Sequence, residues 1–133
     1  MELEAGIHQA RAAEVEPLLS AWAGSGVRVF EVDTGDAVEQ AEIILSLARV
    51  LPTEPLACGQ SWDAFEDSLW EGIFQLKEPR VAIALRGKHW TNQPHGAVQI
   101  MLDILQYVVE ALGDEKATAG RPTKLCVLLA DDS

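Results

Sequence analysis

The sequence predicts an α/β protein in which a small three-stranded parallel sheet is packed with helices, with one extra helix at the amino terminus. Short strand-like runs occur at residues 27–32, 81–85 and 125–129, and segments with helical spacing of apolar residues separate them. The run at 81–85 is apolar throughout, which is typical of a strand covered on both faces. A length of 133 residues, 48% of them hydrophobic, suits a single core.

The amino-terminal residues are predicted to form an amphipathic helix and a hinge. Between residues 2 and 22, apolar side chains recur at near-helical spacing: Leu3, Ile7, Ala10, Val15, Leu18, Leu19 and Trp22. The Gly-Ser-Gly sequence at 24–26 then breaks the helix. We therefore divide the chain into an appendage over 1–26 and a domain over 27–133, and we expect residues 1–23 to be dispensable for folding.

The first half of the domain is interpreted as strand, helix, loop and helix. Residues 27–32 alternate as a strand does, and Asp36 with Glu39 has the spacing of a capping box for a helix that ends near Val50. Two prolines hold residues 51–60 in a surface loop. Ser61 can cap the next helix, which ends at about residues 72–76. Its apolar side chains share one face: Trp62, Phe65, Leu69 and Ile73.

The second half repeats the alternation of strand and helix. After the strand at 81–85, Pro94 can start a helix with a wide apolar face that runs to Leu112. A polar linker follows, and residues 125–129 form the last strand. Strands separated by helices predict that the sheet is parallel.

Charge and targeting signals narrow the class of partner. The net charge of -11 repels nucleic acids and anionic membranes and attracts cationic proteins, although acidity also serves solubility alone. The acidic start and the lack of a long apolar run favour a cytoplasmic protein. Cys58 and Cys126 are far apart and away from histidine, so we expect free thiols, no metal site and no cofactor.

Enzymatic motifs are missing from the sequence. It has no GxGxxG, no Walker-type phosphate loop, no HExxH and no recognisable nucleophile elbow. The pairs His89-Trp90 and Pro94-His95 lie between a strand and a helix, where ligand loops often occur, but we interpret the histidines as polar loop residues without a ligand. We expect that the chain is not an enzyme.

The helix after Ser61 carries the most distinctive pattern. Next to its apolar face, four carboxylates surround Trp70: Asp63, Glu66, Asp67 and Glu71. Like charges three and four positions apart weaken a helix by a few tenths of a kcal/mol each, roughly, so this arrangement is locally costly. A solvated helix face is one interpretation, and a binding surface for cations is the other.

The stretch from Leu51 through Cys58-Gly59-Gln60-Ser61 to Leu69 resembles the loop and following helix of the barstar family, whose pattern runs from a proline to a glycine, then Asn-Trp/Leu-Asp-Ala-Leu and an aspartate. The resemblance extends over about residues 27–130 in the order of elements. It implies a barstar-like fold that plugs a ribonuclease active site with acidic side chains in place of RNA phosphates. The partner-binding residues that it implies are Cys58, Gly59, Gln60, Asp63, Glu66, Asp67 and Trp70.

This sequence departs from the family pattern at several positions. It has Ala57 and Cys58 where barstar has two tyrosines, and Glu66 where barstar has tryptophan. A family acidic contact from a later helix would fall near Gln106. The hypothesis is therefore an intracellular inhibitor or immunity protein that occludes a barnase-type or toxin ribonuclease. The alternatives are a non-inhibitory protein-interaction module of the same fold and an enzyme of unknown type.

Overall fold

Four parallel strands form one sheet. The computed structural model describes residues 3–35, 37, 39–53, 61–87 and 96–131. In sheet order, the strands of this part of the chain are β1 (Gly6–Arg11), β4 (Lys124–Asp131), β3 (Arg80–Arg86) and β2 (Arg28–Asp33). Each neighbouring pair is parallel, which confirms the predicted α/β class.

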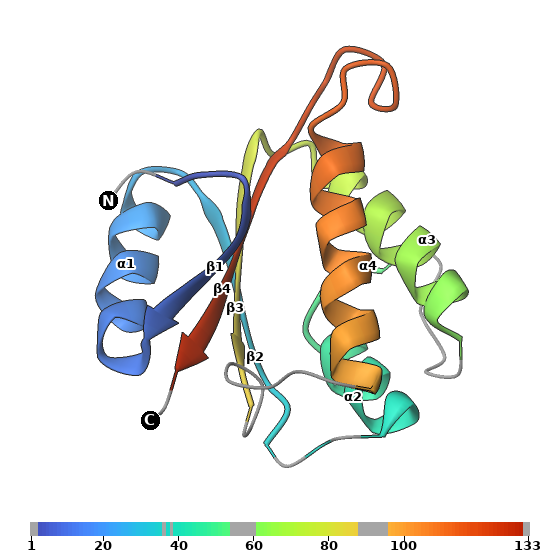
Figure 1. Cartoon of the computed structure of the whole chain (residues 1–133). Coiled ribbons are helices and arrows are strands. Elements are labelled where there is room, and N and C mark those ends of the chain that lie inside the picture. Colours follow the sequence, from blue (N-terminus) through green and yellow to red (C-terminus); the bar gives the residue numbers. More distant parts are fainter. Residues whose placement is uncertain (1–2, 36, 38, 54–60, 88–95, 132–133) are drawn as a thin grey trace.

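The helices cover the two faces of the sheet unequally. On one face lies α1 (Ala12–Gly24), and on the other lie α2 (Gln40–Ala48), α3 (Trp62–Gln75) and α4 (Ala97–Leu112) (Figure 1). Because β1 and β2 are the two edge strands, α1 connects opposite edges of the sheet.

Alternation along the strands divides the apolar core in two. Val81, Ile83 and Leu85 of β3 face the three-helix side, where they join Leu125, Val127 and Leu129 of β4. The side that faces α1 has mostly smaller residues, namely Ala82, Ala84, Cys126 and Ala130, together with Leu128. Small side chains let α1 lie close to the central strands, and the larger ones anchor the three helices opposite.

The amino-terminal segment corrects two predictions. The sheet has four strands rather than three, and residues 2–22 do not form one helix, because β1 precedes α1 and pairs with β4. Gly6 has a φ of 122°, which no helix uses. The spacing of Leu3, Ile7 and Ala10 imitated a helix, yet Leu3 packs on the α1 side of the sheet and Ile7 on the other. Parallel pairing depends on backbone hydrogen bonds, which the periodicity of side chains does not report.

The remaining elements lie close to their predicted places. The strands near 27–32, 81–85 and 125–129 are present, and the Ser61 hydroxyl accepts a hydrogen bond of 3.3 Å from the Ala64 amide at the start of α3. The helix predicted to begin after Asp36 instead begins at Gln40, because the Ala37 amide bonds to the Thr34 carbonyl in a preceding turn. Asp36 itself, and Pro94 before α4, lie outside the described residues.

One close backbone contact positions the segment that follows α2. A Cβ at Gly72 of α3 would overlap the Pro52 carbonyl and would lie only 2.8 Å from the Thr53 nitrogen. Glycine therefore lets the chain pass directly against α3 at this point. Within the residues described, no helix is both long and apolar enough to cross a membrane.

Candidate functional site

Three carboxylates project from the first turns of α3. Asp63 and Asp67 are exposed and Glu66 is half-buried. Their spacing of three and four positions places them on one helical surface. Within the described part of the chain, none of the three has a cationic or hydrogen-bonding partner, and the ion pair found there joins Arg11 to Glu14 at 3.2 Å. We call Asp63, Glu66 and Asp67 the acidic face of α3; its negative charge is not neutralised by the described chain.

The opposite side of α3 explains why these carboxylates point outward. The predicted apolar set is buried: Trp62, Phe65, Leu69 and Ile73. The rings of Trp62 and Phe65 meet edge to face, with centroids 6.0 Å apart and planes at 80°. Packing of this face fixes the rotation of α3 about its axis, so the acidic face is held outward by the core.

The charges of the acidic face affect one another. Burial raises the pKa of the Glu66 carboxyl above its usual range, and the nearby charges of Asp67 and then Asp63 raise it further. The folded chain therefore holds these like charges together at a free-energy cost. A cationic partner would relieve that repulsion.

Trp70 lies one turn beyond Asp67 and belongs to an aromatic row. Its ring stacks on Phe74, with centroids 4.9 Å apart and planes at 20°. The Arg121 guanidinium lies over the Phe74 ring, 4.7 Å from its centroid. The half-buried Trp70 indole therefore has a fixed orientation beside the carboxylates.

Helix α4 adds residues that the sequence interpretation did not include. Tyr107 is 57% exposed and shares with Asp67, Trp70 and Glu71 a groove of about 340 Å³, which Ala111 and Ala117 also line. Asp103 and Glu110 are exposed four positions before and three positions after Tyr107. A large aromatic residue off the apolar face of a predicted helix is the signal that could have identified Tyr107.

The predicted partner-binding residues divide into two groups. The structure brings Asp63, Glu66, Asp67 and Trp70 together on α3. The loop residues Cys58, Gly59 and Gln60 lie outside the described residues, as do His89, Trp90 and His95. Gln106 is exposed on α4, where its Nε2 donates to Glu110 Oε1 at 3.3 Å. The carboxylate that contacts the Gln106 side chain is therefore that of Glu110.

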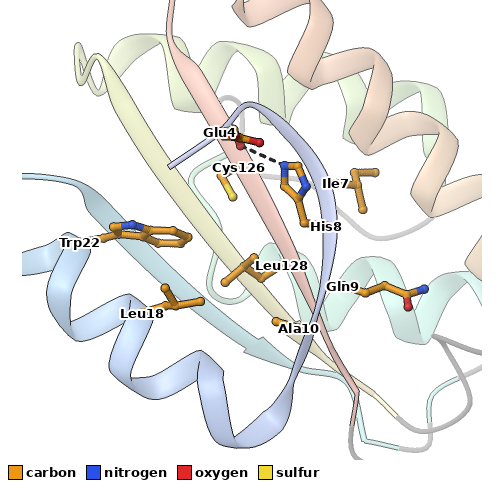
Figure 2. Close-up of a pocket in the computed structure, with 9 residues that line it drawn as sticks. All are labelled: Glu4, Ile7, His8, Gln9, Ala10, Leu18, Trp22, Cys126 and Leu128. Atoms are coloured by element: carbon orange, nitrogen blue, oxygen red, sulfur yellow. Dashed lines mark hydrogen bonds between the residues drawn. The ribbon is translucent and has the colours of Figure 1, made fainter. Parts of the chain in front are cut away.

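A separate pocket lies between α1 and the β1–β4 side of the sheet. Trp22 and Leu18 approach it from α1 (Figure 2). Its volume is about 440 Å³. The strands supply most of the remaining lining: Ile7, His8, Gln9, Ala10, Cys126 and Leu128. Glu4 completes it, and its carbonyl accepts a 3.2 Å hydrogen bond from His8 Nε2.

The chemistry of this pocket is mainly apolar. Cys126 is buried with a free thiol, and burial raises the pKa of that thiol to about 11, so it stays protonated at neutral pH. Across the described ranges, no three histidine, cysteine, aspartate or glutamate side chains are placed to hold a metal ion. The pocket can accept an apolar group, but it does not form a nucleophile or metal centre from these residues.

Together, the fold and the site define a parallel α/β protein with a four-stranded sheet and an acidic surface on α3. Comparison with models of protein families, with curated proteins and with solved structures gave no match.

Proposed function

We propose that this protein is a cytoplasmic inhibitor or immunity protein, and not itself an enzyme, that binds a basic ribonuclease or toxin through the acidic face of α3. One observation carries the proposal: Asp63, Glu66 and Asp67 are held on one helical surface without a cationic partner among the described residues. Nuclease active sites carry lysine, arginine and histidine for phosphate binding. A rigid array of carboxylates can occupy such a site in place of RNA.

The physical basis of inhibition is competition for the same cations. The carboxylates of Asp63 and Asp67 stand one helical turn apart on an element fixed by its packed core, so binding requires little ordering of this surface. The repulsion that raises the pKa of Glu66 would be relieved by positive charges of the partner. The charge of the whole chain, -11, draws the same kind of partner and opposes direct binding of RNA or anionic lipid.

The resemblance of the loop and helix to the barstar family suggests which class of partner to test first. That resemblance points to a secreted or toxin ribonuclease of the barnase type, with Asp63 and Asp67 as the main carboxylates. The order of elements from β2 to β4, strand, two helices, strand, helix and strand, agrees with the predicted order in this region. Strand β1 and helix α1 precede this arrangement at the amino terminus.

A non-inhibitory interaction module is the second candidate function. The observation that favours it is the pocket between α1 and the β1–β4 side, which lies on the other face of the sheet from α3. Its apolar lining, including Leu18, Trp22 and Leu128, suits an apolar side chain of a partner protein. In this case binding would be unaffected by changes on the acidic face.

The test compares Asp67→Ala with Glu16→Ala, an exposed carboxylate on α1. Each variant is titrated into a basic microbial ribonuclease, and binding is measured by calorimetry alongside RNA cleavage. We expect the wild-type chain to stop cleavage and Asp67→Ala to lose about 2 to 5 kcal/mol of binding free energy, because partner cations would be left buried and unpaired. Glu16→Ala should bind as the wild type does. Unchanged affinity for Asp67→Ala would reject this site, and capture of a non-nuclease partner that does not need Asp67 would favour the second candidate.

A further inference from the structure

The groove between α3 and α4 has the composition of a receptor for a flat cation. One wall carries Trp70 with the carboxylates of Asp67 and Glu71, and the other carries Tyr107. Two alanines, Ala111 and Ala117, complete the lining, and their small side chains leave a volume of about 340 Å³. That volume is at the lower end of the range for ligand pockets and is enough for a single long side chain.

The aromatic row already binds a guanidinium at its other end. Arg121 lies 4.7 Å from the centroid of the Phe74 ring, and Phe74 in turn stacks on Trp70 at 4.9 Å. Trp70 is the member of this row that lines the groove. The Arg121 contact shows that this row can stack with a guanidinium, and the groove offers Trp70 and Tyr107 for a second one.

Charge decides which side chain suits the groove. Asp67 has no partner in the part of the chain that is described, and the Glu71 contact found there is a hydrogen bond of 2.9 Å from the Gln75 amide, which carries no charge. A guanidinium can stack on an aromatic ring and also donate two parallel hydrogen bonds to a carboxylate. A lysine ammonium is compact and strongly hydrated, so it cannot make both contacts as well.

We propose that the groove between α3 and α4 receives an arginine side chain of the protein partner, with the guanidinium stacked on Trp70 and Tyr107 and paired with Asp67 and Glu71. The inference rests on the proposed function, because it names a contact within the same interface. It adds α4 to the binding surface and distinguishes arginine from other cations. The acidic face of α3 alone would attract both lysine and arginine.

The test uses three short peptides that differ at one side chain. Capped Gly-Gly-Xaa-Gly-Gly, with arginine, lysine or the uncharged arginine analogue citrulline at Xaa, is titrated into the isotope-labelled full chain and followed by NMR. We expect the arginine peptide to shift the Trp70 indole N–H, which a Trp70→Phe variant identifies, and the amides of Ala111 and Ala117. Lysine should bind roughly fivefold or more weakly, and citrulline should produce no saturable shift.

Two variants change the groove itself, and a third variant on α1 is their control. Ala111→Leu places bulk in the groove without removing charge, and Tyr107→Ser removes one ring from an exposed position. Both should weaken arginine-peptide binding, whereas Glu16→Gln on α1 should not. Equal binding of lysine and arginine, shifts confined to other surfaces, or unchanged binding by Ala111→Leu would overturn the inference.

Ribonuclease inhibition by the same variants separates the two proposals. Saturable arginine binding in the groove without inhibition of any basic ribonuclease would support the groove and reject the proposed function. Inhibition that Asp67→Ala abolishes but Ala111→Leu and Tyr107→Ser leave intact, together with no arginine-peptide binding, would reject the groove and retain the function.

Discussion

Gly72 controls how closely the segment after α2 approaches α3. Alanine is the better helix former by about 1 kcal/mol, so propensity alone predicts that Gly72→Ala stabilises α3. The added Cβ, however, would overlap the Pro52 carbonyl and lie 2.8 Å from the Thr53 nitrogen, and backbone atoms cannot move aside as a side chain can. We expect a net loss of about 2 kcal/mol or more in the free energy of unfolding, measured by urea denaturation.

Gly24 supplies the matched control for Gly72. It is the last residue of α1, its φ is not positive, and a Cβ there would meet nothing within 4 Å. Gly24→Ala should therefore be neutral or slightly stabilising. If the two substitutions changed the free energy of unfolding equally, the close contact between α3 and the segment at Pro52 would not be the cause of the loss at Gly72.

Glu66 provides a pH-dependent test of the acidic face. Burial, then the charges of Asp67 and Asp63, raise the pKa of its carboxyl in the folded chain. The folded state therefore binds this proton more tightly than the unfolded state, and stability falls as pH rises past the unfolded value. Glu66→Gln should raise Tm at pH 7, and the gain should disappear below about pH 3.5, where both states are protonated.

Thermal unfolding of Glu66→Gln at the two pH values is compared with that of Glu16→Gln, which changes an exposed carboxylate on α1. The control should show little change at either pH. A gain for Glu66→Gln of equal size at both pH values would mean that packing, and not relief of repulsion, is responsible.

At the scale of elements, β1 is a strand of the sheet and α1 packs against it. Val15, Leu19 and Trp22 of α1 are buried against the strands, and β1 pairs with β4 over its whole length. The hinge-like Gly-Ser-Gly sequence at 24–26 predicts from sequence alone that residues 1–23 are dispensable. The packing favours the opposite outcome, because their removal would expose Cys126, Leu128 and Ala130 of β4.

Deletion of residues 1–23 distinguishes these two expectations. We expect loss of the single cooperative transition in thermal and urea unfolding, because one face of the sheet would lose its cover. Leu19→Ala in the full chain tests the same packing more mildly and should cost about 2 to 5 kcal/mol. A deletion variant that unfolds cooperatively at the wild-type Tm would establish the domain over 27–133 as independent.

At the scale of the whole molecule, we expect the charge of -11 to steer association with a cationic partner. The acidic face of α3 continues onto α4 through exposed Asp103 and Glu110 beside Tyr107, so the field extends over a two-helix surface. Raising salt from about 50 to 500 mM should lower the association rate with a basic ribonuclease tenfold or more, because the Debye length falls below about 10 Å.

The dissociation rate should change less over the same salt range, because contacts within a formed interface are screened less than a long-range encounter. Stopped-flow mixing gives both rates. A salt-independent association rate would show that the acidic surface does not steer the encounter, and the apolar pocket at α1 would then become the stronger docking candidate.

The local periodicity of the sequence determined much of the fold and, within the candidate site, the acidic face of α3. The apolar faces of α3 and α4, the Ser61 cap and three of the strands could be predicted, because each depends on neighbours within a few residues. The outward position of Asp63, Glu66 and Asp67 followed from the same periodicity, since the buried face of α3 leaves these positions to solvent.

Tertiary packing decided the rest. Strand β1 is held by hydrogen bonds to β4, which lies more than 100 residues later in the chain. The side chains of β1 do not alternate between apolar and polar, so its sequence does not predict a strand. The groove likewise exists only because α4 packs beside α3 and brings Tyr107 opposite Trp70. The sequence by itself determined which residues prefer helix, strand, core or surface. Which of those surfaces meet depends on contacts between distant segments, whose free energy no local pattern records.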